Sequence, residues 1–130
     1  MDRRVSTPTG QAELEHAMLV AMTQSARPEN AAALSSQIPR GSVTNRDFSG
    51  VGCFTEFHID DGVIDFPRST LDGVGHIILE DFGLMSGARF PSGLVATFQI
   101  CIEQGRLKVL EGLTLDGEPW PDDVSKFEIV

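Results

Sequence analysis

The chain has 130 residues, which is about the size of one domain. Its composition of 41% hydrophobic and 22% charged residues is that of a globular protein and excludes a wholly disordered chain. The formal charge of -9 repels phosphate groups, so it argues against nucleic acid and anionic membranes as partners and favours a basic protein. We expect a single domain over residues 1–130, with a disordered tail at residues 1–7.

The compartment is predicted from what the sequence lacks. No apolar run reaches the length that crosses a bilayer, and no apolar core follows the basic residues at the start of the chain. We therefore expect a cytoplasmic protein without a membrane partner. In that compartment Cys53 and Cys101 are expected to be free thiols in strands, and neither has the CxxC spacing of a zinc ligand.

The first forty residues predict two helices. Thr7-Pro8 is typical of a helix start, and the first helix is expected to run to about Gln24. Its apolar stripe consists of Leu14, Met18, Ala21 and Met22. Its polar side is expected to hold Gln11, Glu13 and Glu15. A second helix should open at Pro28 and end before Pro39 and Gly41.

From Val43 onward the sequence predicts strands. In residues 51–59 one face holds Val51, Cys53, Thr55, Phe57 and Ile59, and the other holds Phe54, Glu56 and His58. The dipeptide Asp61-Gly62 lies between two apolar runs and predicts a two-residue hairpin turn. That hairpin would place Phe57 opposite Phe66 and His58 beside Asp65. A further strand is expected at residues 74–81.

A second hairpin is predicted around Gln104-Gly105. The apolar face of its first strand is expected to hold Ala96, Phe98, Ile100 and Ile102, and that of the returning strand Leu107, Val109, Leu113 and Leu115. In strict register Glu111 would lie on the apolar face opposite Phe98. Either Glu111 is buried with a partner, or a bulge near Gly112 turns it away. The cost of burying an unpaired carboxylate favours the bulge. Residues 127–130 are expected to add an edge strand.

Two helices followed by hairpins predict an α+β fold. We expect the two N-terminal helices to pack on one face of a mainly antiparallel β-sheet, arranged as a meander of hairpins.

Four residues could form a metal or acid-base site if their strands were neighbours, namely Glu56, His58, His76 and Glu80. Alternating polar residues are also typical of a solvated sheet face, which is the interpretation that we favour. Ser86 lacks the spacing of a nucleophile elbow and is expected in a turn. The sequence therefore predicts no catalytic residue and no cofactor.

The single tryptophan has two interpretations. Trp120 lies between two prolines, so it could be a recognition anchor, or it could pin the last segment onto the core. We favour the second. With Asp122 and Asp123 it still forms the candidate partner contact, because acidic residues beside an aromatic ring resemble the rim and anchor of an interface.

Two stretches resemble a known family. They are residues 47–55 (DFSGVGCFT) and residues 110–114 (LEGLT), the latter followed by residues 118–121 (EPWP). Together they resemble a family of small bacterial proteins, a domain of unknown function, over most of the chain from the second helix onward. The resemblance implies a bacterial source and a compact α+β domain, and it implies no catalytic residues.

The leading functional hypothesis is a non-enzymatic binding protein that acts through protein contacts. Its partner would be another protein, or copies of itself joined through an exposed sheet edge. An inhibitor or immunity role against a basic toxin is one form of this hypothesis. The alternative is a small enzyme, or a ligand- or metal-binding protein, that uses the Glu and His sheet face or the loop between Phe82 and Phe90.

Overall fold

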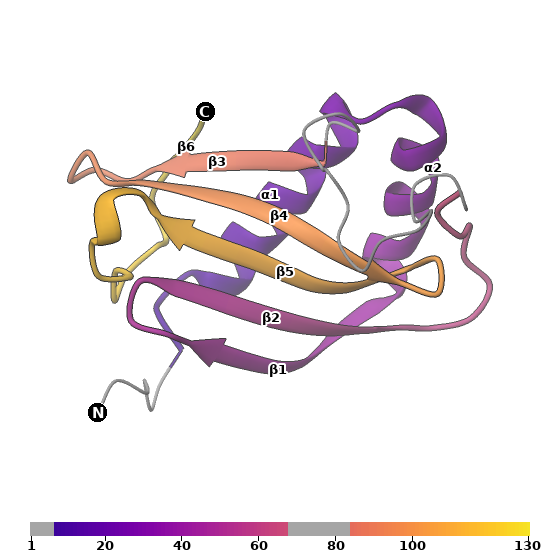
Figure 1. Cartoon of the computed structure of the whole chain (residues 1–130), viewed down its shortest axis with the longest axis horizontal. Helices are drawn as coiled ribbons and strands as arrows, with labels where there is room; N and C mark the ends of the chain where they lie inside the picture. The colour runs from indigo at the N-terminus through magenta and orange to yellow at the C-terminus, as the bar shows by residue number, and fades with distance from the viewer. Residues whose placement is uncertain (1–6, 68–83) are drawn as a thin grey trace.

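The computed structural model describes residues 7–67 and 84–130. The helices are α1 (Gln11–Ser25), α2 (Pro28–Gln37) and two short 3-10 turns, η1 (Ile38–Arg40) and η2 (Leu115–Gly117). The strands are β1 (Gly41–Phe48), β2 (Gly52–Ile59), β3 (Met85–Arg89), β4 (Val95–Glu103), β5 (Arg106–Thr114) and β6 (Glu128–Ile129). Figure 1 shows α1 running behind the strands with α2 packed beside it, so the α+β prediction is confirmed.

The described strands form one six-stranded sheet in the order β1-β2-β5-β4-β3-β6, and every neighbouring pair is antiparallel. The expected meander is therefore wrong in one respect. Strands β3, β4 and β5 form a meander, but β5 then pairs with β2, which lies far back in the chain, and β6 returns to the outer edge of β3. The edge strand expected at residues 127–130 is confirmed as β6.

The hairpin predicted at Asp61-Gly62 is wrong. Strand β2 pairs instead with the preceding strand β1, where Val43 lies opposite Phe57. Residues 60–67 belong to no strand, although Gly62 does adopt the left-handed conformation of a turn, with a φ of 89°.

An apolar residue after this turn anchors a loop instead of a strand. The amide of Phe66 donates to the carbonyl of Gly105 at 2.8 Å, and its ring is buried in the core. His58 lies 3.5 Å from the carboxylate of Asp60, whereas Asp65 lies beside Arg106. Of the apolar residues that suggested a strand here, Phe66 is therefore explained by burial, whereas Ile64 is 54% exposed.

Helix α1 has the expected apolar stripe but a different polar side. Its N-cap is Gly10 in the left-handed conformation, so the helix begins later than Thr7-Pro8 predicts. Leu14, Met18 and Met22 are completely buried, as expected. Gln11 and Glu15 were expected on the exposed side and are also buried, because they fall on the same helical stripe and find polar partners there.

The core lies between the helices and the sheet. Its largest fully buried side chain is Trp120, whose ring meets Phe90 edge-on at 6.5 Å and Phe98 edge-on at 5.9 Å between centroids. Helix α2 contributes Ala33 and Leu34, both completely buried. The last segment of the chain is thus part of the core.

A bulge in β5 resolves the register of Glu111. Ile102 pairs with Leu107 whereas Cys101 pairs with Val109, so the extra residue is Lys108. Beyond the bulge Glu111 lies opposite Gln99, which donates a hydrogen bond to its carboxylate. The predicted reorientation of Glu111 is confirmed, but the bulge lies near Lys108 and not near Gly112.

The bulge also exchanges two neighbours between the faces. Gly112 faces the core, opposite Phe98, where an added Cβ would lie 2.6 Å from the Phe98 ring. Leu113, which the sequence placed inward, points away from the core and is 41% exposed. The apolar side chain displaced in this way lies on the opposite face of the sheet.

Of the remaining expectations, some are confirmed, one is wrong and others concern residues that the structure does not describe. Cys53 and Cys101 are free thiols in β2 and β4, as expected. Ser86 lies in β3, not in a turn, and its hydroxyl donates to the carbonyl of Met18 at 3.1 Å. The strand expected at residues 74–81, the residue Phe82 and the tail at residues 1–7, apart from Thr7, lie outside the described residues.

Candidate functional site: the open face of the sheet

The proposed metal ligands are only partly described. Glu56 and His58 lie on β2 and point away from the helices, while His76 and Glu80 lie outside the described residues. Within residues 7–67 and 84–130, no group of three or more His, Cys, Asp or Glu residues could hold a metal ion. Of the two described residues, His58 lies beside the carboxylate of Asp60.

Trp120 holds the end of the chain against the core. Its amide donates to the carbonyl of Gly50 at 2.6 Å, and its indole N–H donates to Gln11 Oε1 at 3.2 Å. The interpretation in which Trp120 pins the last segment onto the core is confirmed. Its ring is buried, so a partner would meet the neighbouring exposed residues Asp122 and Asp123 and not the ring.

The carboxylate of Asp123 is already hydrogen-bonded within its own segment. It accepts hydrogen bonds from the Ser125 hydroxyl at 2.6 Å and the Ser125 amide at 2.9 Å, which lower the pKa of Asp123. A parallel bridge joins Asp123 to Thr9, beside the start of α1. The carboxylate of Asp123 therefore shapes this turn.

A buried polar cluster joins α1 to the first hairpin. The carboxylate of Glu15 accepts two hydrogen bonds from Arg46, at 2.7 and 2.9 Å, and one from Thr55 at 2.7 Å. Gln11 donates to the same carboxylate at 3.1 Å. The hydrogen bond to Glu15 raises the pKa of Arg46. Because the group is this fully bonded, it is a structural connection between α1, β1 and β2.

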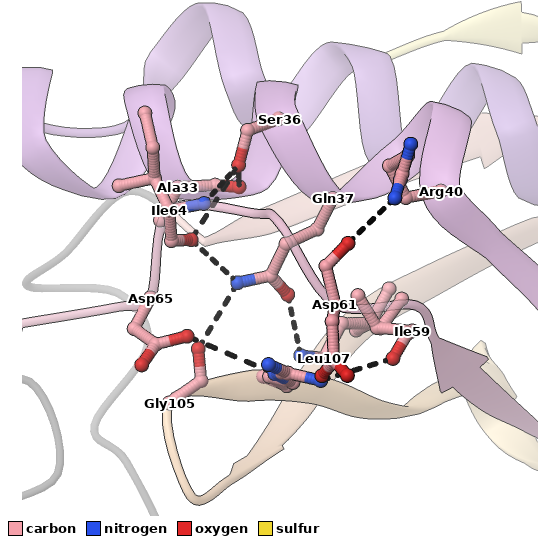
Figure 2. A network of polar contacts seen from close by, with 11 residues as sticks. Ala33, Ser36, Gln37, Arg40, Ile59, Asp61, Ile64, Asp65, Gly105 and Leu107 are labelled. Carbon is pink, nitrogen blue, oxygen red and sulfur yellow. Dashed lines mark hydrogen bonds and ion pairs between the residues drawn. The ribbon is translucent and has the colours of Figure 1, made fainter.

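A second polar cluster fixes residues 60–67 to the turn between β4 and β5 (Figure 2). The completely buried amide of Gln37 donates to the carbonyls of Ile64 at 2.8 Å and Gly105 at 3.0 Å. Its oxygen accepts from the amide of Leu107 at 2.8 Å. Sequence analysis missed Gln37; the only signal was a polar residue three positions after the buried Leu34.

The charged side chains around this turn also form ion pairs and hydrogen bonds. Arg106 lies 3.0 Å from Asp61 and 3.7 Å from Asp65, and it donates to the carbonyl of Ile59 at 3.1 Å. Arg40 donates to the carbonyl of Asp61 at 2.6 Å. Both of these described arginines are therefore already engaged with oxygen acceptors of the protein.

Neither of the two thiols, Cys53 and Cys101, has a lowered pKa. Burial raises the pKa of the Cys53 thiol to about 12, and partial burial raises the pKa of Cys101. A reactive cysteine needs a lowered pKa, so neither residue has the environment of a nucleophile.

The side of the sheet opposite the helices is covered by none of the described helices, and we call it the open face (Figure 1). Phe54 is 38% exposed there and lies opposite Glu111, while Leu113 lies opposite Gly52. Phe54 and Leu113 are therefore diagonal neighbours on adjacent strands. Val109 comes before Leu113 on β5 and lies opposite Glu56. We call Phe54, Val109 and Leu113 the apolar patch.

A hollow of about 470 Å³ adjoins the patch where β4 begins and β5 ends. Ala96 pairs with Thr114, so the next residues outward, Val95 and Leu115, are neighbours across the two strands. The hollow is lined by Ser92, Gly93, Leu94, Val95, Leu115, Asp116, Glu118 and Pro119. It combines apolar walls with two carboxylates.

A second hollow, of about 590 Å³, lies on the helical side between α1 and α2. It is lined by His16, Val20, Thr23, Gln24, Ser35, Ile38 and Pro39. Histidine is its single ionisable lining residue, so this hollow has no charge pattern that would select a ligand.

Both edges of the described sheet are poor templates for strand addition. Strand β1 carries an irregularity between Val43 and Asn45, followed by the charged residues Arg46 and Asp47. Strand β6, on the other edge, has two residues. Bulges, charges and short length are the features by which native edge strands avoid pairing with other chains.

No family model, curated protein or solved structure matches this chain. The family resemblance of residues 47–55 and 110–121 therefore stays a hypothesis. Neither of the described helices α1 and α2 has the length and apolar character needed to cross a bilayer.

Proposed function

We propose that this protein is a non-enzymatic binding domain whose open face contacts a basic protein. The observation that carries the proposal is the exposure of Phe54 and Leu113, at 38% and 41%, on a face that no described helix covers. Large apolar side chains that adjoin one another on a surface are typical of protein contacts.

The charge of the surroundings selects the kind of partner. Acidic residues on or beside the open face are Asp47, Glu56, Glu111, Asp116 and Glu118. A basic partner would be attracted to them over a long range, with apolar contacts formed at the centre. A second copy of a chain with a charge of -9 would bring like charges together, and the protected edges of the sheet also disfavour self-pairing.

The enzymatic alternative has less support among the described residues. Of its four proposed ligands, Glu56 and His58 are described, and His58 lies beside Asp60. The thiols have raised pKa values, and the buried Glu15 is fully engaged with Arg46 and Thr55. A binding role, in contrast, uses the exposed apolar patch and the acidic residues around it.

Affinity capture from the native host tests the proposal, using the wild-type chain and two single-charge variants. Leu113→Glu places a carboxylate in the apolar patch, whereas Ile64→Glu makes the same change at an exposed apolar residue outside the sheet. We expect a protein that is retained by the wild type and by Ile64→Glu, lost with Leu113→Glu, and released by raised salt. Equal capture by both variants would contradict the proposal.

A further inference from the structure

We propose that the hollow beside Val95 and Leu115 receives an arginine side chain of the bound partner. This inference rests on the proposed function, since it names the anchor of the same contact. The chemistry of the walls is the first argument. Val95, Leu115 and Pro119 offer apolar surface to an aliphatic stem, and Asp116 and Glu118 offer carboxylates to its charged end.

Arginine fits this combination better than lysine. Its guanidinium is planar and more weakly hydrated than an ammonium group, so it loses less on entering a partly apolar hollow. It also presents several N–H donors in fixed directions, which suits two carboxylates that come from one turn. The volume of about 470 Å³ leaves room for one long side chain with its water.

The hollow is formed before any partner arrives. Asp116 and Gly117 both have left-handed backbones, with φ of 61° and 70°, and this turn carries the two carboxylates to the rim. On one side the Thr114 hydroxyl donates to the carbonyl of Glu118, and on the other the amide of Trp120 donates to the carbonyl of Gly50. A site fixed in this way loses little conformational entropy on binding.

Position is the third argument, because the hollow continues the apolar patch. Leu115 follows Leu113 by two residues, which is roughly 7 Å along an extended chain. A partner segment that covers Phe54 and Leu113 can therefore place its next side chain in the hollow. The residues that line the hollow between α1 and α2 include no carboxylate.

Titration of the ¹⁵N-labelled protein with two peptides tests this inference. The first is the acetylated and amidated peptide Val-Thr-Val-Arg-Val-Thr-Val, and the second has citrulline, which is uncharged and nearly isosteric, in place of arginine. We expect the arginine peptide to shift the amide signals of Leu94, Val95, Leu115 and Gly117 and to bind about tenfold more tightly than the citrulline peptide.

Two double variants separate a specific anchor from diffuse attraction. Asp116→Asn with Glu118→Gln should lower the affinity for the arginine peptide about tenfold, to that of the citrulline peptide. Glu13→Gln with Glu29→Gln removes the same charge from exposed positions on the two helices, away from the open face, and should change it less than about twofold. Equal affinity for the two peptides, or equal losses in the two double variants, would overturn the inference.

The outcome is distinguishable from that of the proposed function. If host capture is lost with Leu113→Glu but the arginine peptide causes no shifts at the hollow, the anchor is wrong and the open face remains the binding surface. If the peptide binds at the hollow but Leu113→Glu captures its partner normally, the proposed contact through the apolar patch is wrong.

Discussion

The two faces of the sheet are built from the same strands and have opposite chemistry. In β2, Cys53 and Thr55 are completely buried against the helices, while Phe54 between them is 38% exposed. On the covered face even the charged group, Glu15, is enclosed and fully bonded. On the open face apolar side chains reach solvent. The difference indicates that the covered face maintains the fold, whereas the open face presents apolar side chains to solvent.

Breaking the Glu15–Arg46 pair should have the largest effect on the covered face. Arg46→Ala leaves the Glu15 side chain, which is 4% exposed, without its counter-charge, so we expect a loss of about 3 kcal/mol in the free energy of unfolding. Glu15→Ala should cost less, because the Arg46 side chain is 22% exposed and can be hydrated. Urea unfolding measures both.

The open-face control for this pair is Ser42→Ala, at an exposed position on the same strand, which should change the free energy of unfolding by less than about 0.5 kcal/mol. Equal destabilisation by Arg46→Ala and Ser42→Ala would remove the distinction between the faces.

Two adjacent residues of β5 offer a sharper comparison. The Cβ of Gly112→Ala would lie 2.6 Å from Phe98 Cε1 and 3.0 Å from Trp120 Cη2, so we expect a destabilisation of about 1–3 kcal/mol. Leu113→Ala, one residue later and on the open face, should cost less than about 1 kcal/mol. Thermal and urea unfolding of the two variants measure the difference, and the reverse order would show that the register of β5 is wrong.

The smallest effect is a dependence on pH that comes from the covered thiol. Burial raises the pKa of Cys53 from 9.0 to about 12. Between these values the folded thiol keeps a proton that the unfolded thiol has lost, so stability should fall as the pH rises, by at most about 1.4 kcal/mol per unit.

Urea unfolding at pH 8, 9 and 10 tests this slope, with Cys53→Ala as the control. The variant should lose less stability than the wild type as the pH rises. Matching slopes in the two proteins would show that the Cys53 thiol does not remain protonated in the folded state.

The parts of the fold that the sequence predicted are those where local pattern and tertiary packing agree. Helix α2 and the hairpin at Gln104-Gly105 fall in this class. Residues 60–67 do not, because Gln37 and Gly105 bind this segment as a loop although its apolar residues suggest a strand. Partners that lie far away in the sequence leave no local signal.

The proposed binding surface was predictable only in part. The alternation in β2 correctly placed Phe54 on the side away from the core. Leu113 was placed on the wrong face, because the bulge at Lys108 changes the alternation without a glycine or proline to mark it. Trp120 drew attention as a conspicuous aromatic, but it is a core residue, and the exposed positions are its acidic neighbours.

The position of Trp120 also bears on how the chain folds during synthesis. The core closes around a side chain from near the end of this sequence, and the amide of Val124 donates to the carbonyl of Thr9, beside the start of the first helix. These contacts join segments more than a hundred residues apart. Completing the core must therefore wait until Trp120 and Val124 have left the ribosome, and until then Phe98 and Phe90 lack the ring that covers them.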